Sequence, residues 1–180
     1  KIDDVKKTKN IIQSKINNKF IKGTILISEE GINGCISGKE TQIDIFLREI
    51  KKILRIRKIS LKINYSRFVP FYRLKIKIKN EIVTLGKRDI KVIEKTGKFV
   101  SPKDWREVIN NKDIKIIDTR NQYEIEIGKF KNSININMDS FRDFPELIKK
   151  IKLKKEDEIA MYCTGGIRCE KASSYLIKKG

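Results

Sequence analysis

The sequence predicts an α/β protein of two domains, an α+β domain followed by a domain built on a central parallel sheet. A chain of 180 residues is long enough for two domains that each bury a core. In the first half, helical patterns interleave with alternating apolar patterns, whereas short apolar strands and helices alternate in the second half. A polar stretch with Gly97 and Pro102 lies between the halves. We therefore expect a first domain over residues 1–86, a linker over 87–102 and a second domain over 103–180.

The first domain is predicted to contain two helices and several strands. Apolar residues at helical spacing predict a helix over residues 3–17 and another that begins near Gly38. Cys35 falls within an apolar strand pattern, so we expect it in the core. This order is typical of a ferredoxin-like domain, here without its first strand. The alternation of apolar and polar residues predicts strands over residues 23–28, 32–37, 59–63 and 74–78.

The second domain is predicted to begin with a helix that Ser101 caps and Pro102 starts. Further helices are expected over residues 144–151 and from Cys169 onward. Asp118 and Cys163 each follow a predicted strand directly, and the carboxyl ends of parallel strands carry functional residues in such folds. We therefore expect these two side chains to lie at one edge of the sheet. The strands are predicted over residues 114–118, 133–136 and 158–162.

The segment after the last of these strands has the pattern of an anion-binding loop. Cys163 would face the unpaired N–H groups and the positive end of the following helix, and both lower the pKa of a thiol. Gly165 and Gly166 permit the positive φ values of a tight cradle. Arg168 closes the loop and adds positive charge. The loop, completed by Thr164 and Ile167, is one residue shorter than in tyrosine phosphatases, which favours a sulfur-sized group over phosphate.

The composition narrows the range of functions. The absence of histidine excludes Ser-His-Asp and Cys-His catalytic sites within this chain. Three cysteines without a CxxC pair or an export signal are typical of free thiols in a reducing cytoplasm, and no metal site is expected. Cys169 is a candidate second thiol, with simple packing as the alternative. No run of about 20 apolar residues predicts a membrane span.

A formal charge of +19 favours a polyanionic partner, and nucleic acid is the commonest of these. An AT-rich genome, which enriches Lys, Ile and Asn everywhere, is the alternative explanation. Aromatic residues stand among the basic ones in the middle of the first domain, an arrangement suited to single-stranded loops. A solvated lysine face above core aromatics is the competing interpretation. The candidate nucleic-acid-binding residues are Arg55, Arg57, Lys58, Arg67, Arg73 and Lys75.

The run from Tyr162 to Ser173 resembles the rhodanese-domain tRNA uridine hydroxylases of bacteria. Further segments are similar to that family: residues 28–34, 70–75, 82–86, 117–128 and 141–146. The resemblance implies oxygen-dependent hydroxylation of the wobble uridine to 5-hydroxyuridine, with the anticodon loop of tRNA as partner. It makes Cys163 the essential cysteine, and Asp118 with Arg120 the supporting pair beside it. The resemblance implies molecular oxygen as the co-substrate, and no haem, flavin or iron signature in the sequence shows how that oxygen is activated.

Two other functions stay open at this point. A rhodanese-type sulfurtransferase would carry a persulfide on Cys163, and a catalytically silent RNA-binding module would need no thiolate at all. The silent module is disfavoured because the loop retains both Cys163 and Arg168. Because the chain begins with Lys1 and stops within a helical pattern, we expect a fragment whose rhodanese domain is incomplete at its C-terminal end.

Overall fold

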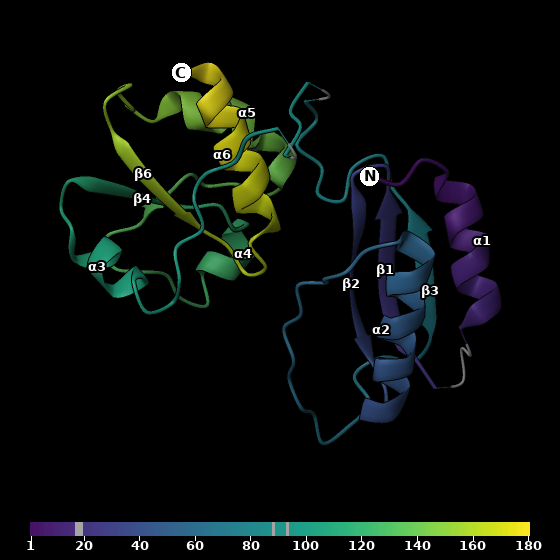
Figure 1. Ribbon diagram of the computed structural model, residues 1–180. Coiled ribbons are helices and arrows are strands. Elements are labelled where there is room, and N and C mark those ends of the chain that lie inside the picture. Colours follow the sequence, from purple (N-terminus) through teal and green to yellow (C-terminus); the bar gives the residue numbers. More distant parts are fainter. Residues whose placement is uncertain (17–19, 88, 93) are drawn as a thin grey trace. The chain divides into compact units, whose positions relative to one another are not determined.

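The computed structural model describes residues 1–16, 20–87, 89–92 and 94–180 (Figure 1). The chain divides into two compact units, Lys1–Ile82 and Val83–Gly180. Each unit has its own three-stranded sheet and its own hydrophobic core. The first sheet is mixed and the second is entirely parallel, which confirms the predicted fold class. The first unit matches a ferredoxin-like domain and the second a rhodanese-like domain.

In the first unit, β1 is the central strand of the sheet β2-β1-β3 (Figure 1). It pairs with β2 in antiparallel and with β3 in parallel orientation. Ile25 and Ile27 of β1 form one core with Ile12 of α1 and with Phe46 and Ile50 of α2. Both helices therefore cover the same face of the sheet. The elements are α1 (Val5–Lys15), β1 (Lys22–Ser28), β2 (Gly31–Ser37), α2 (Glu40–Leu54) and β3 (Leu74–Ile78).

Most elements predicted for this unit are confirmed within one to two residues. The predicted end of the first helix at Asn17 lies outside the described residues. The strand expected over residues 59–63 is wrong, because that segment pairs with no strand among the described residues. Ile59 packs against the core, but Leu61 and Ile63 are exposed, so the alternating residues do not form one buried face.

Cys35 is exposed, which corrects the expectation of a core position. Its neighbours Ile32 and Ile36 pack toward the helices, and successive side chains of a strand point to opposite faces. The odd-numbered position between them therefore points away from the core. The apolar run around Cys35 was too short to reveal which of its residues face inward.

In the second unit, the sheet has the order β5-β4-β6. Ile117 of β4 packs with Met138, with Phe144 of α5 and with Ala172 and Tyr175 of α6. The elements are α3 (Trp105–Asn110), β4 (Ile114–Asp118), α4 (Gln122–Ile125), β5 (Ile134–Asn135), η1 (Phe141–Asp143), α5 (Phe144–Leu147), η2 (Ile148–Lys150), β6 (Glu158–Tyr162) and α6 (Ile167–Lys179).

The bounds of β4 and β6 are as predicted, whereas the helices differ from expectation. The first begins at Trp105, because residues 102–104 form a turn in which the Ser101 hydroxyl accepts the Asp104 N–H. The helix expected over 144–151 is divided into short α and 3-10 pieces. The last begins at Ile167 rather than Cys169. Leu85 and Ile90, which the sequence assigned to the first domain and the linker, lie in the core of the second unit.

Candidate active site at the Cys163 loop

The parallel pairing of β4 with β6 brings two predicted site residues to one edge of the sheet. Asp118 stands opposite Tyr162 in the register, so Cys163, the next residue, emerges beside the end of β4. The loop then turns at once into α6. The expectation that strand ends would gather Asp118 and Cys163 is therefore confirmed. A cavity of about 410 Å³ lies near Ile114, the start of β4, and Cys163 is not among the residues that line it.

The sulfur of Cys163 is surrounded by hydrogen-bond donors. The Gly166 N–H donates to Sγ at 2.9 Å. A hydrogen bond from the Cys169 thiol is the largest of the effects that lower the pKa of Cys163 to about 5. The N–H groups of Cys169, Gly165 and Gly166 also lower this pKa, whereas burial raises it. In return, the neighbouring thiolate raises the pKa of Cys169. This arrangement favours the thiolate of Cys163 at neutral pH, with the Cys169 thiol as its hydrogen-bond donor.

Gly166 is the N-cap of α6 and has a φ of 88°, a left-handed conformation that favours glycine. Gly165 does not share this conformation, which corrects the expectation that both glycines need positive φ. A Cβ at Gly165 would meet no atom within 4 Å. The cradle therefore needs glycine for its backbone conformation at Gly166 and not at Gly165.

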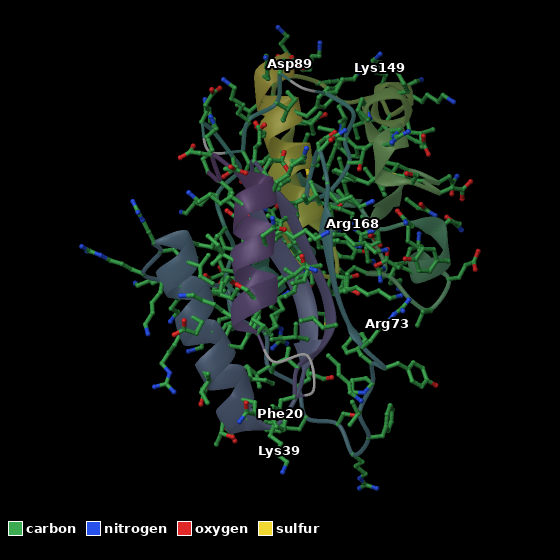
Figure 2. All side chains as sticks on the ribbon, turned by 90° about the vertical axis from the view of Figure 1, so that its right-hand side faces the viewer. Phe20, Lys39, Arg73, Asp89, Lys149 and Arg168 are labelled. Carbon is green, nitrogen blue, oxygen red and sulfur yellow. The ribbon has the colours of Figure 1, made fainter. Side chains whose placement is uncertain are left out.

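Arg168, labelled in Figure 2, lies in the first turn of α6. It is fixed by a carboxylate that the sequence did not single out, that of Glu124. Its guanidinium donates to Glu124 Oε2 at 2.6 Å and to Oε1 at 2.8 Å, a bidentate ion pair with both side chains largely buried. The Thr164 hydroxyl donates to the same carboxylate. Hydrogen bonds from Arg168 are the main cause that lowers the pKa of Glu124 to about 2. The Thr164 hydroxyl and the Asn121 N–H also lower this pKa, whereas burial raises it. Glu124 therefore ties both ends of the loop to α4.

Asp118 is fully buried, and its carboxylate is occupied by two partners. Arg120 donates to Oδ1 at 3.0 Å and to Oδ2 at 2.7 Å, and the Tyr162 hydroxyl donates to Oδ2 at 2.5 Å. The Arg120 guanidinium also lies 5.3 Å from the centre of the Tyr162 ring. Its remaining donors go to the carbonyls of Glu124 and Gly128. The Asp118–Arg120 pair thus holds the backbone of α4 and of Gly128, which follows this helix.

Comparison with protein families adds the context for this site. Residues 1–82 match the UPF0176 acylphosphatase like domain, and residues 101–180 match the Rhodanese-like domain. This chain has the two-domain architecture of the tRNA uridine hydroxylase family. The resemblance that the sequence motifs predicted is confirmed at the level of family.

In this tRNA uridine hydroxylase architecture, the predicted site residues form two sets, one in each unit. The loop residues and both predicted ion-pair partners lie in the rhodanese-like unit. The candidate nucleic-acid-binding residues all lie in the first unit, where Arg55 ends α2 in a left-handed conformation with a φ of 54°. Arg57, Lys58, Arg67 and Arg73 are exposed in the segment between α2 and β3, and Lys75 is exposed on β3 itself. No helix among the described residues is long and apolar enough to cross a membrane.

Three residues of this rhodanese-like unit that hold the site side chains in place were not predicted from the sequence. Glu124 holds Arg168, Tyr162 holds Asp118, and Thr119 lies 3.5 Å from the Cys169 sulfur and donates to the Tyr162 carbonyl at 3.0 Å. A local signal existed for Glu124 alone. An acidic residue three positions after Asn121 is the pattern of a capping box, and the Asn121 N–H does donate to the Glu124 carboxylate at 3.1 Å.

Proposed function

We propose that this protein hydroxylates C5 of the wobble uridine in tRNA, with the Cys163 thiolate as its nucleophile. The observation that carries the proposal is the cradle of N–H donors around the Cys163 sulfur, which lowers the pKa of this thiol. A thiolate at neutral pH is the form that attacks electrophilic carbon. The two-domain architecture shared with the tRNA uridine hydroxylase family supports tRNA as the substrate class in this proposal.

In the reaction that we propose, a flipped uridine enters above the loop. The Cys163 thiolate forms a bond to C6 of uracil, and the C5–C6 double bond opens, so that C5 becomes electron-rich. Molecular oxygen bonds to C5 and takes up a proton. An external thiol reductant then supplies two electrons and two protons, which release one oxygen atom as water and leave a hydroxyl on C5. Loss of the C5 proton and of the thiolate restores the double bond.

The residues around Cys163 have separate parts in this scheme. The N–H groups stabilise the thiolate both before it attacks and after it leaves. Arg168, held by Glu124, keeps a positive charge beside the loop, where the uracil carbonyl oxygens gain negative charge. Cys169 lies close enough to donate a hydrogen bond to the sulfur as the thiolate is expelled.

Binding of the anticodon loop is assigned to the first unit in this proposal. The segment between α2 and β3 exposes three aromatic rings, Tyr65, Phe68 and Tyr72, among its arginines. Exposed rings stack on splayed bases, and arginines bind phosphates. This combination fits a single-stranded loop better than a regular duplex.

The proposal is tested by nucleoside mass spectrometry of tRNA from a host that lacks its own uridine hydroxylase. Cells that express the full-length protein should contain 5-hydroxyuridine or its derivatives, and cells that express Cys163→Ser should not. The Glu126→Gln variant, which changes an exposed residue of the same unit, is the control and should retain the product. Equal product from Cys163→Ser would refute the assignment of the nucleophile.

A rhodanese-type sulfurtransferase is the second candidate function. The donors that surround a single sulfur would equally stabilise a persulfide anion, and this observation favours it. Incubation with thiosulfate, followed by intact-protein mass spectrometry, would then add the mass of one sulfur atom to the wild type but not to Cys163→Ser. A thiolated nucleoside in place of 5-hydroxyuridine would select this function over hydroxylation.

A further inference from the structure

The sheet of the first unit has one face that neither of its helices covers. Ile25 and Ile27 of β1 point toward α1 and α2, so Thr24 and Leu26 point the other way. The register places Cys35 and Lys75 beside Thr24, and Asn33 and Lys77 beside Leu26. We call this surface the open sheet face. It consists of Lys22, Thr24, Leu26, Gly31, Asn33, Cys35, Ser37, Lys75 and Lys77.

The charge on the open sheet face has a single sign. Alternation along β3 and its flanks puts Arg73, Lys75, Lys77 and Lys79 on this side, and all four are exposed. No carboxylate occupies any of the strand positions that form the face. The helix α2, by contrast, has three acidic residues among its basic ones. The sheet thus presents a row of cations about 7 Å apart along one strand.

We propose that the open sheet face binds the phosphate backbone of single-stranded RNA. The identity of that RNA as an anticodon loop rests on the proposed function. Charge complementarity selects the occupant, because a row of cations on a face whose strand positions hold no carboxylate attracts a chain of phosphates. The positions of β2 on this face are small or polar, with Gly31, Asn33 and Cys35 on the far side of β1 from the row. A polynucleotide backbone can therefore approach the sheet closely.

The aromatic segment adjoins this row of cations in the chain. Tyr72 is 99% exposed and immediately precedes Arg73, the first cation of the row. Figure 2 shows Arg73 where this segment leads into the sheet. Phosphates on the sheet face and bases against the exposed rings would together bind a strand whose bases are unstacked. An acidic protein segment is the other polyanion that could occupy the face, and it would gain nothing from the rings.

The first test is the salt dependence of tRNA anticodon stem-loop binding, measured by fluorescence anisotropy. Lys75→Gln/Lys77→Gln should reduce the slope of log K against log salt by about 1.4, since each lost phosphate contact on a single strand removes about 0.7. The same slope change corresponds to binding about tenfold weaker at 0.15 M salt. Circular dichroism should confirm that the variant is folded.

The matched control is Lys6→Gln/Lys7→Gln on α1, which removes the same charge from two exposed side chains in the helical layer. It should change the affinity by less than about twofold, because it removes no phosphate contact. Equal weakening by both double variants would overturn the proposal, because net charge alone would then explain binding. Unchanged binding by Lys75→Gln/Lys77→Gln would overturn it as well.

Cys35 provides a second test that needs no loss of charge. It is an exposed thiol within the open sheet face. In a Cys163→Ser/Cys169→Ser background, the anticodon stem-loop should slow alkylation of Cys35 at least several-fold, and an acidic peptide should not. Alkylation at the same rate with and without saturating RNA would place the RNA elsewhere. Since neither binding test requires 5-hydroxyuridine, a failed hydroxylase assay leaves their outcome readable.

Discussion

The second unit contains two arginine–carboxylate pairs whose surroundings differ. Asp118 is fully buried, and the Arg120 guanidinium donates hydrogen bonds to that carboxylate and to two backbone carbonyls. Arg168 instead joins the Cys163 loop to α4, and its partner Glu124 also holds Thr164 of the loop. The first pair therefore stabilises the scaffold, whereas the second positions the loop that contains Cys163. Sequence motifs gave both arginines the same status, and their contacts separate them.

Removal of the Asp118 carboxylate should cause the largest loss of folding stability. Asp118→Ala leaves the guanidinium of Arg120 buried without its partner, and loss of one member of such a pair costs about 3–5 kcal/mol. Urea unfolding should report this loss in the free energy of unfolding. Asp113→Ala, which removes an exposed carboxylate of the same unit, should change it by about 0.5 kcal/mol or less. Similar values for the two variants would show that the buried pair contributes nothing special.

Glu124→Gln should affect activity more than stability. Without the bidentate carboxylate, Arg168 and Thr164 lose their common anchor, and misplacement of a catalytic loop by about 1 Å costs on the order of 100-fold in rate. The measurement is the rate of tRNA modification beside the urea midpoint. Glu126→Gln, an exposed residue at the end of the same short helix, is the matched control and should retain wild-type rate.

The pH dependence of the Glu124–Arg168 pair has a defined sign. The Arg168 hydrogen bonds lower the pKa of Glu124 to about 2, below its ordinary value of 4.5. A carboxylate with a lowered pKa contributes stability that is present in full above pH 4.5 and is lost as the pH falls toward 2. The difference in unfolding free energy between wild type and Glu124→Gln should therefore be constant from pH 5 to 8 and shrink only below that window. A decline that began near neutral pH would contradict the ion pair.

The thiol pair offers a smaller and more local change. Cys169→Ala removes the donor that contributes most to the low pKa of Cys163, so that pKa should rise above its wild-type value of about 5. Alkylation of Cys163 by iodoacetamide, followed against pH, measures the thiolate directly. Cys169→Ser keeps a hydroxyl donor and should restore part of the shift. An identical pH profile for wild type and Cys169→Ala would assign the whole shift to the backbone donors.

The two glycines of the loop provide the finest comparison. Gly166→Ala should cost about 1–2 kcal/mol, because its φ of 88° is unfavourable for a residue with a Cβ. Gly165→Ala should be nearly neutral, since neither φ nor space opposes a methyl group there. Thermal unfolding of the two variants side by side measures the difference. Equal losses would mean that the loop requires glycine at both positions.

The sequence predicted the chemical centre of the site better than its surroundings. Strand ends located Asp118 and Cys163 at one edge, because hydrophobic runs mark parallel strands and topology aligns their ends. The partner of Arg168 could not be predicted, since Glu124 lies 44 residues away in the chain and only the folded structure brings the two together. The strand expected over residues 59–63 shows the same limit. Its alternating pattern is real, but strand formation also needs a partner that local sequence does not reveal.

The most direct test of the nucleophile uses tRNA with 5-fluorouridine at the wobble position. Fluorine in place of the C5 hydrogen prevents the proton loss that expels Cys163, so the bond between its sulfur and C6 should persist. Tryptic mass spectrometry of the full-length protein should then find the nucleotide on the peptide that contains Cys163 and on no other. Wild-type protein that modifies normal tRNA but forms no such adduct, or an adduct that persists in Cys163→Ser, would contradict nucleophilic attack by this thiolate.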